Sequence, residues 1–245
     1  MFNGTELVRY SMLNSFGSDF ITFAAVDSGV PIQTIVLILI IPVIVTIIAF
    51  FRQVIGIKAF GIYTPALVTF AFLDIGSKAE SFWRGLKYGI FLFILILVVG
   101  IIARALLRKL KMLYLPRMAI IITLVAVATL FFLIVSGYSQ RTGMASVSIF
   151  PIVIMITLVE KFVATYIEKG VRQATILSLE TLIISVACYF VLGWGDLLVF
   201  VQKFPWVVLF TIPINIILGR WTGLRLTEYF RFKDIIKNAE IPYKK

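Results

Sequence analysis

Long apolar segments alternate along the chain with short polar connections that are mostly basic. Most of these segments approach the roughly 20 residues that a helix needs to cross the hydrocarbon core of a membrane. The pattern therefore predicts an all-α fold, a polytopic membrane bundle of about seven transmembrane helices. The seven segments are residues 31–51, 54–73, 86–107, 115–135, 147–167, 174–192 and 204–218.

The second segment allows two interpretations. Its purely apolar part, residues 60–73, would be only about 21 Å long as a helix, whereas the hydrocarbon core is about 30 Å thick. Either the segment is a full span that begins near Val54 and buries Lys58 close to its end, or it is re-entrant and broken at Gly61 and Pro65. The full span is favoured, because the Lys58 ammonium could extend to the interface.

Composition and charge fix the class and the orientation. With 61% hydrophobic and 14% charged residues, the chain has the composition of an integral membrane protein. Most of the Lys and Arg residues, 17 of 23, fall in residues 52–58, 104–117 and 161–172 or after residue 219. The positive-inside rule makes these parts cytoplasmic, so the N-terminus is outside and the C-terminus inside. The net charge of +11 is then a topology signal, and no motif supports nucleic-acid binding.

Three regions follow from this topology: an extracytoplasmic N-terminal segment 1–30, the seven-helix domain 31–219 and a basic cytoplasmic tail 220–245. The tail mixes apolar and basic residues, which predicts an amphipathic helix on the cytoplasmic leaflet. Anionic lipid headgroups would attract it by about 1 kcal/mol per basic residue. The same tail could instead be a docking surface for a cytoplasmic partner.

Charged residues also interrupt the fifth and sixth segments. Glu160 lies ten residues before Gly170, in the turn between these segments, and Glu180 lies ten residues after it. Both carboxylates should therefore stand about 15 Å from the turn on neighbouring helices. If they face each other, one is expected to be protonated, because burial and like charge both disfavour two carboxylates.

Two alternatives remain open for these charges. Each carboxylate could find a cation, so that Glu160 meets Lys58 or Arg52 while Lys161 extends to the interface. The fifth span could also begin higher, which would put Glu160 and Lys161 near the interface. Our hypothesis is a candidate intramembrane polar site in a cavity that faces the cytoplasm, formed by Glu160, Lys161, Glu180 and Lys58.

Catalytic chemistry has little support in this sequence. The chain has no histidine, which excludes Ser-His-Asp and Cys-His schemes and His-ligated metals within it. Its single cysteine, Cys188, lies in an apolar run and cannot form an intramolecular disulfide. No phosphate-binding loop, GxSxG or HExxH motif occurs. We therefore expect no cofactor, no metal site and no enzymatic activity. Asn215, two residues after Pro213, is expected to form a hydrogen bond at a kink.

Four stretches, in order, resemble one bacterial family: the seven-transmembrane domain usually fused to an inactive transglutaminase-like domain. They match its Gly-rich first cytoplasmic loop, its Pro-Arg entry to a span, its Phe-Pro to acidic-basic span and its Gly-x-Arg-Leu end. The stretches are FRQVIGIKAFGIYTPALVTFAF (51–72), LYLPRMAIIIT (113–123), SIFPIVIMITLVEKFVATYIEKGVRQA (148–174) and GRWTGLRLTEYFRFKDI (219–235).

The resemblance singles out polar and special residues of this chain. Glu180 departs from the family pattern, which tends to a small residue there, and this weakens the paired-carboxylate idea as a general mechanism. The positions that match are Gly56, Gly61, Pro65, Pro116, Arg117, Phe150, Pro151, Glu160, Lys161, Glu168, Gly170, Gly223 and Arg225.

The resemblance also implies a location and partners. It implies a bacterial inner membrane and an extracytoplasmic transglutaminase-like domain before the first span, where this sequence has only about 30 residues. The chain thus looks like the membrane half alone, with its soluble partner lost or encoded separately. Genes that often neighbour the family's members encode an ATP-grasp ligase and a retropepsin-like protease, which become candidate partners.

The function that we expect is a non-enzymatic scaffold or signal-coupling component that works with soluble partners. The alternative is a transporter or channel for a small anionic or peptide-like solute, and an intramembrane enzyme is third. A central cavity lined by charges would favour transport, whereas a tightly packed bundle with its charges at the cytoplasmic rim would favour the scaffold. Candidate docking residues are Arg52, Arg104, Arg108, Arg117, Glu168, Arg172, Arg225, Arg231 and Lys233.

Overall fold

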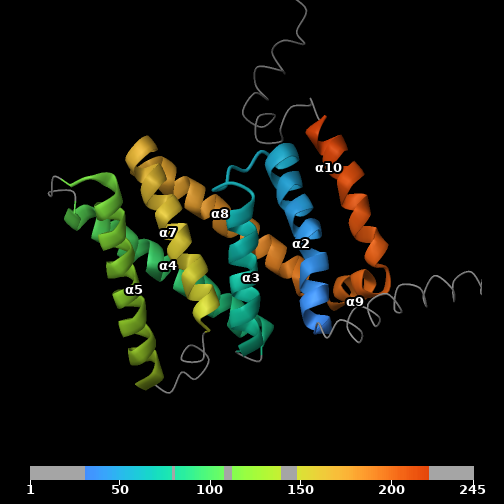
Figure 1. The fold of residues 1–245 in the computed structure, drawn as a ribbon, viewed down its shortest axis with the longest axis horizontal. Helices are drawn as coiled ribbons and strands as arrows, with labels where there is room; N and C mark the ends of the chain where they lie inside the picture. Colours follow the sequence, from blue (N-terminus) through green and yellow to red (C-terminus); the bar gives the residue numbers. More distant parts are fainter. Residues whose placement is uncertain (1–30, 79–80, 108–111, 139–147, 221–245) are drawn as a thin grey trace, which may run out of the picture. The chain divides into compact units, whose positions relative to one another are not determined.

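Every regular element in the described part of the chain is helical (Figure 1). The structure, a computed structural model, describes residues 31–78, 81–107, 112–138 and 148–220. The predicted all-α class is confirmed. The predicted tail and the docking residues Arg108, Arg225, Arg231 and Lys233 lie outside the described residues.

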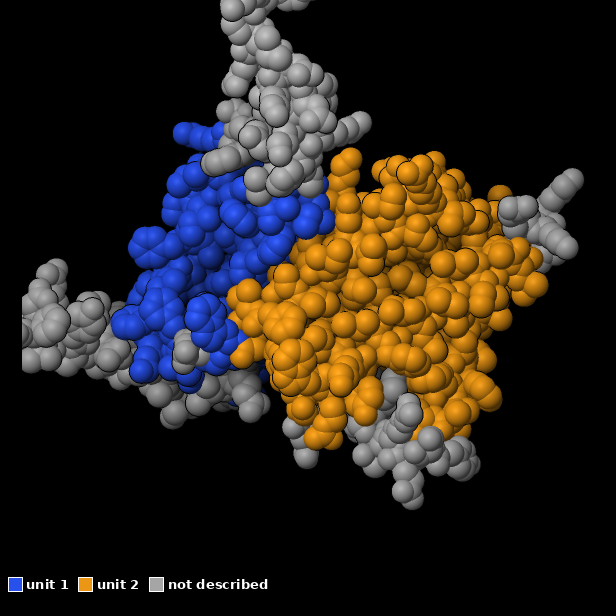
Figure 2. Space-filling model, turned by 180° about the vertical axis from the view of Figure 1, so that it is seen from behind, with its two compact units in different colours: residues 1–57, 194–245 blue, residues 58–193 orange. Residues whose placement is uncertain are grey.

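The chain divides into two compact units, which Figure 2 distinguishes by colour. The described residues of unit 2, which covers residues 58–193, form five helices. Unit 1 combines residues 1–57 with residues 194–245. The helices of unit 2 are α3 (Tyr63–Lys78), α4 (Phe82–Leu107), α5 (Tyr114–Tyr138), α7 (Ile149–Lys169) and α8 (Val171–Leu192).

In unit 1, two helical segments from opposite ends of the sequence pack together. Helix α2 (Ile32–Phe50) continues as a π-helical turn, Phe51–Ile55, which ends at Gly56 in the left-handed conformation, φ 89°. Helix α9 (Gly195–Lys203) bends by 104° into the 3₁₀ helix Pro205–Phe210, and α10 (Thr211–Gly219) follows it.

Asn215 joins the two halves of unit 1. Its Nδ2 donates to Thr46 Oγ1 of α2 at 2.7 Å and to the Thr211 carbonyl of its own helix at 2.8 Å. The local bond confirms the expected hydrogen bonding near Pro213. The bond to α2 was not expected, because sequence separation gives no sign of which helix faces Asn215.

The second predicted span differs from the expectation. Helix α3 begins at Tyr63 rather than near Val54, and Pro65 lies in its first turn, where a missing N–H disrupts no helical hydrogen bond. The chain is not broken at Pro65; the irregular backbone precedes the helix, with Gly61 at φ 72°. With 16 residues, α3 is about 24 Å long. We call the non-helical residues 56–62 the entry segment.

Five of the described helices are long and apolar enough to cross a membrane. They are α2 with its π-helical turn, α4, α5, α7 and α8, and the bent pair from Leu197 to Gly219 would make a sixth. Helix α3 falls short of this length. The described segments nevertheless follow the predicted order of apolar stretches along the chain.

Glycines let α3 and α4 approach within backbone contact. A Cβ on Gly85 of α4 would lie 2.2 Å from the Cα of Gly76 on α3. One turn further on, a Cβ on Gly89 would lie 2.4 Å from the Phe72 ring. Small residues serve this purpose in membrane helices, where close van der Waals contact replaces the hydrophobic effect as the force between helices. The Gly76–Gly85 contact therefore fixes the α3–α4 pair.

The helix ends that flank the connections predicted to be cytoplasmic lie together at one end of unit 2. Helices α3, α5 and α8 begin there, and α4 and α7 end there (Figure 1). Only Gly170 separates α7 from α8, and its φ of 84° and ψ of 170° suit glycine alone. The turn predicted around Gly170 thus forms a one-residue reversal.

Candidate functional site

The entry segment is held by the middle of α8. The backbone N–H of Lys58 donates to Oε2 of Glu180 at 3.0 Å, and the N–H of Phe60 donates to Oγ1 of Thr181 at 3.2 Å. The positive charge of Lys58 also attracts the Glu180 carboxylate. Glu180 is nine residues from the start of α8, about 14 Å along its axis. Two adjacent side chains of α8 thus accept hydrogen bonds from two backbone N–H groups that have no acceptor within a helix.

The same face of α8 continues as a line of hydroxyl groups against α3. Ser185 Oγ donates to the Pro65 carbonyl at 3.1 Å, and Thr69 Oγ1 donates to the Ser185 carbonyl at 3.2 Å. The buried Cys188 thiol lies beside the Thr69 hydroxyl. We call this contact the α3–α8 polar seam, formed by Lys58, Phe60, Pro65, Thr69, Glu180, Thr181, Ser185 and Cys188.

Sequence reasoning missed most of this seam. Hydroxyl side chains in helices often bond to their own backbone, and Thr181 and Ser185 also donate to the Leu177 and Thr181 carbonyls of α8, respectively. The signal that could have found the seam is spacing. Ser178, Thr181, Ser185 and Cys188 recur at intervals of three and four residues, which places them on one side of a helix. All four are buried.

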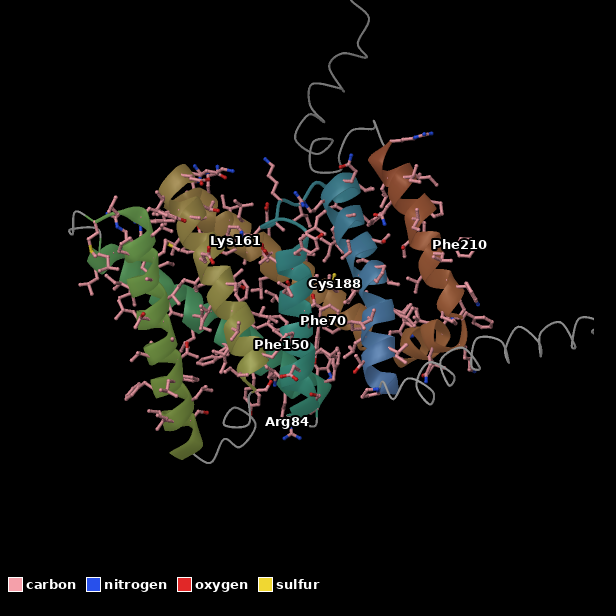
Figure 3. The ribbon with its side chains drawn as sticks, viewed as in Figure 1. Phe70, Arg84, Phe150, Lys161, Cys188 and Phe210 are labelled. Atoms are coloured by element: carbon pink, nitrogen blue, oxygen red, sulfur yellow. The ribbon has the colours of Figure 1, made fainter. Side chains whose placement is uncertain are left out.

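The structure separates the four residues of the predicted intramembrane site into two groups. Lys58 and Glu180 come together in the seam, where the backbone N–H of Lys58 donates to the Glu180 carboxylate. Glu160 and Lys161 lie on α7 with exposed side chains, and Lys161 is labelled in Figure 3. Among the described residues, no hydrogen bond or ion pair joins either of them to Glu180. The proposed pairing of Glu160 with Glu180 is therefore absent from this part of the chain.

The end of unit 2 that was predicted to be cytoplasmic carries a group of basic side chains, which we call the basic rim: Lys58, Arg104, Arg117, Lys169 and Arg172. The Arg104 guanidinium stacks over the Tyr166 ring of α7, 5.2 Å from its centroid. Arg117 donates from Nη2 to the Met112 carbonyl at 2.9 Å. Lys169 and Arg172 are exposed on either side of Gly170, next to the exposed Glu168.

The opposite end of unit 2 carries an aromatic cluster. The Phe82 ring stacks on Tyr189 at 4.4 Å between centroids, and the Tyr189 hydroxyl donates to the Phe82 carbonyl at 2.9 Å. Trp83 and Phe190 pack edge to face beside them and are exposed. Aromatic side chains gather at membrane interfaces in this manner. The aromatic cluster and the basic rim therefore mark the two opposite ends of unit 2, where membrane interfaces are expected.

The candidate site offers little conventional chemistry. Among the described residues, no group of three or more Cys, Asp or Glu side chains could hold a metal ion. Asp74 accepts a hydrogen bond from the Ser148 hydroxyl, which ties the end of α3 to the start of α7. The groups brought together are suited to hydrogen bonding and to charge recognition.

Comparison with known proteins gives one match. The model of a family described as seven transmembrane helices usually fused to an inactive transglutaminase matches residues 5–236. The chain belongs to this family. No curated protein and no solved structure matches it.

Membership of this seven-helix family identifies the chain as a multi-pass membrane protein. The seven helices of the family exceed by two the five long helices described above. The two further apolar segments are the short helix α3 and the bent segment that ends at Gly219. The resemblance noted in the four sequence stretches is confirmed. The inactive transglutaminase belongs to the family's usual architecture and suggests a role other than catalysis.

Proposed function

We propose that this chain is a non-enzymatic scaffold of the bacterial inner membrane, which couples soluble partner proteins to the membrane through the basic rim. The chain's membership of a family that is usually fused to an inactive enzyme supports a non-catalytic role. The basic rim supplies the surface. Its side chains come from four helices, α4, α5, α7 and α8, and from the entry segment, so a partner would contact several parts of unit 2 at once.

The chemistry of the interior carries this proposal. Within the described residues, the buried polar side chains are serine and threonine hydroxyls, together with the Cys188 thiol and the Tyr189 hydroxyl. Charged side chains that line a solute pathway face the interior of a bundle, whereas here those of the described part are exposed or half-buried. A packed interior whose charged side chains lie toward the surface suits a scaffold better than a conduit. The buried serine and threonine residues are Thr46, Thr69, Thr129, Ser136, Ser178, Thr181 and Ser185.

The rim also indicates the chemistry of a partner. Exposed Lys169 and Arg172 present positive charge beside the one-residue turn at Gly170, which holds them on rigid helix ends. Complementary charge steers association and fixes orientation. An acidic surface on a soluble protein is therefore the expected counterpart. The partners that we propose are an ATP-grasp ligase and a retropepsin-like protease, with a transglutaminase-like protein on the opposite side.

The test is purification of the tagged full chain from its native membrane in mild detergent, with mass spectrometry of the proteins that accompany it. We expect a soluble partner in stoichiometric amount. It should be lost from the double variant Lys169→Glu, Arg172→Glu and kept by the matched variant Arg84→Glu, Lys87→Glu. The control makes the same change of charge on exposed residues at the other end of unit 2 (Figure 3). Equal recovery from both variants would contradict the role of the rim.

One observation favours a second function, transport of a small anionic or peptide-like solute. The half-buried Glu180 stands well inside α8 and holds irregular backbone, and such backbone in membrane proteins is often associated with solute sites. If the chain purifies without a partner, flux of such solutes into liposomes becomes the deciding measurement. Glu180→Gln would then reduce the flux, while Glu168→Gln at the exposed end of α7 would leave it unchanged.

A further inference from the structure

Helix α7 has a line of side chains that points away from the core of unit 2. The opposite side of this helix is buried and apolar, and it includes Met155, Leu158 and Phe162. The outward line advances by three and four residues in turn, the spacing of the contact positions in a left-handed helix pair. It consists of Phe150, Val153, Thr157, Glu160 with Lys161 beside it, Ala164 and Ile167. We call it the α7 outward stripe.

The stripe is open and lies on a helix long enough to span a membrane. Phe150 and Val153 are 52% and 51% exposed, and Thr157, Glu160 and Lys161 are exposed too. Figure 1 shows α7 between α5 and α3, both of which it contacts, so the stripe is the side that these helices leave uncovered. Phe150 and Lys161 mark its course in Figure 3.

Two full charges stand near the middle of this stripe. Glu160 is eleven residues from Ile149 and nine from Lys169, or about 16 and 14 Å from the two ends of α7. Charged side chains at such depth normally pair with one another or with a neighbouring helix. Within the described residues, neither Glu160 nor Lys161 has a hydrogen-bonding or ion-pair partner. Groups of opposite charge that pair with Glu160 and Lys161 must therefore come from outside the described residues of unit 2.

A second copy of the same helix supplies the required counterparts. Consecutive helical residues point about 100° apart and differ by about 1.5 Å in height. In a parallel pair related by a two-fold axis along the membrane normal, a residue on one flank of the contact faces the residue on the other flank of its partner. Glu160 of each copy would then face Lys161 of the other, at nearly the same depth. The stripe is self-complementary in charge.

The residues one turn away on either side would permit this approach. Thr157 and Ala164 are small, and small side chains let membrane helices come close. The Thr157 hydroxyl already donates to the Ile154 carbonyl of its own helix at 2.7 Å, so it needs no partner of its own. The apolar side chains of Val153 and Ile167 would extend the contact toward both ends.

We propose that the α7 outward stripe is the contact surface of a parallel two-fold homodimer, in which Glu160 of each copy pairs with Lys161 of the other. The two pairs neutralise four charges that would otherwise face lipid. Two chains in this arrangement would present two basic rims side by side, on the same face of the membrane.

Charge inversion tests the proposal on the full chain. Two-colour single-molecule colocalisation in liposomes at low protein density measures pairing. The wild-type chain should pair, and Glu160→Lys or Lys161→Glu alone should lower its association constant about tenfold or more, because like charges then face each other. A mixture of Glu160→Lys with Lys161→Glu should restore pairing between the two variants. The double variant Glu160→Lys, Lys161→Glu should restore it within one species.

Controls separate this contact from a general effect of charge and from misfolding. Lys87→Glu on α4 changes the same charge at an exposed position off the stripe and should pair as the wild type does. Thr157→Cys should crosslink in native membranes under oxidation, whereas Thr123→Cys, exposed on α5, should not. A monomeric wild-type chain in liposomes, unimpaired single variants, or a mixture that stays unpaired would overturn the proposal. So would crosslinking of Thr157→Cys to a different protein only.

Discussion

The N–H of Lys58 donates to the Glu180 carboxylate at 3.0 Å, across 122 residues of sequence. One residue lies in the entry segment before α3, and the other lies well inside α8. The contact gives an irregular stretch of backbone a hydrogen-bond acceptor that no helix of its own supplies. Glu180 is a charged residue within the candidate span α8, and this hydrogen bond gives its carboxylate a partner.

We expect the acceptor oxygen at position 180, rather than its charge, to hold the entry segment. Glu180→Gln keeps an oxygen that can accept the Lys58 N–H, whereas Glu180→Ala leaves that donor unsatisfied, at a cost of about 1–3 kcal/mol. Cys188 provides the measurement, because it is the chain's single cysteine and is fully buried. A thiol-reactive fluorogenic dye will report its exposure on heating. Equal midpoints for the two variants would show that the hydrogen bond contributes nothing.

The contact between Gly76 and Gly85 should tolerate no methyl group. Gly85→Ala would place a Cβ 2.2 Å from the Gly76 Cα, so α3 and α4 must move apart, which typically costs about 1–3 kcal/mol. The same dye measurement applies. Gly195→Ala is the matched control, because a Cβ there meets nothing within 4 Å. A midpoint for Gly85→Ala as high as the control's would mean that the two helices are not in backbone contact.

Gly170 isolates the effect of backbone conformation from that of packing. A Cβ at this position meets nothing within 4 Å, yet φ is 84° and ψ is 170°. Gly170→Ala should therefore destabilise unit 2 by about 1–3 kcal/mol through strain alone. The midpoint temperature at which Cys188 becomes reactive to the dye should fall, although no contact is lost. An unchanged midpoint would indicate that the turn relaxes to a conformation open to alanine.

In unit 1, the bond from Asn215 to Thr46 should appear as a coupling between these two residues. Hydrogen bonds between membrane helices contribute about 0.6 kcal/mol on average and reach about 1.7 kcal/mol. The short 2.7 Å distance and the buried Thr46 hydroxyl predict a value toward the upper end of this range. A double-mutant cycle of Asn215→Ala and Thr46→Val, followed by tryptophan fluorescence during unfolding in SDS, measures it. Additive effects of the two changes would rule out the coupling.

The sequence was sufficient for the helices, because apolar length is a direct consequence of bilayer thickness. The turn at Gly170 was also predictable, since charged residues flank a glycine between two apolar segments. The start of α3 was not. Apolar residues run on from Val54 through Phe60 with little interruption, and hydrophobicity is the same whether such residues are helical or extended. The residues before α3 are instead held in a non-helical conformation by the acceptors Glu180 and Thr181, which are 122 and 121 residues from their donors.

The candidate site was less predictable for a geometric reason. Glu160 and Glu180 are each ten residues from Gly170, which gives them similar distances from the turn. Ten residues rotate a helix by about 1000°, roughly 80° short of three full turns, so equal distance does not make two side chains face each other. The direction of each is set by which side of its helix is apolar. For α7 that places Glu160 outward, and for α8 it places Glu180 toward the entry segment.

The glycine contact between α3 and α4 also bears on how this protein can be handled. Two backbones that touch exchange contacts with surrounding alkyl chains for closer contacts with each other, and the alkyl chains of lipid and of detergent offer similar dispersion forces. Exchange of lipid for detergent should therefore leave the α3–α4 geometry unchanged. Observations made on the extracted protein will then describe the same helix pair that exists in the cell.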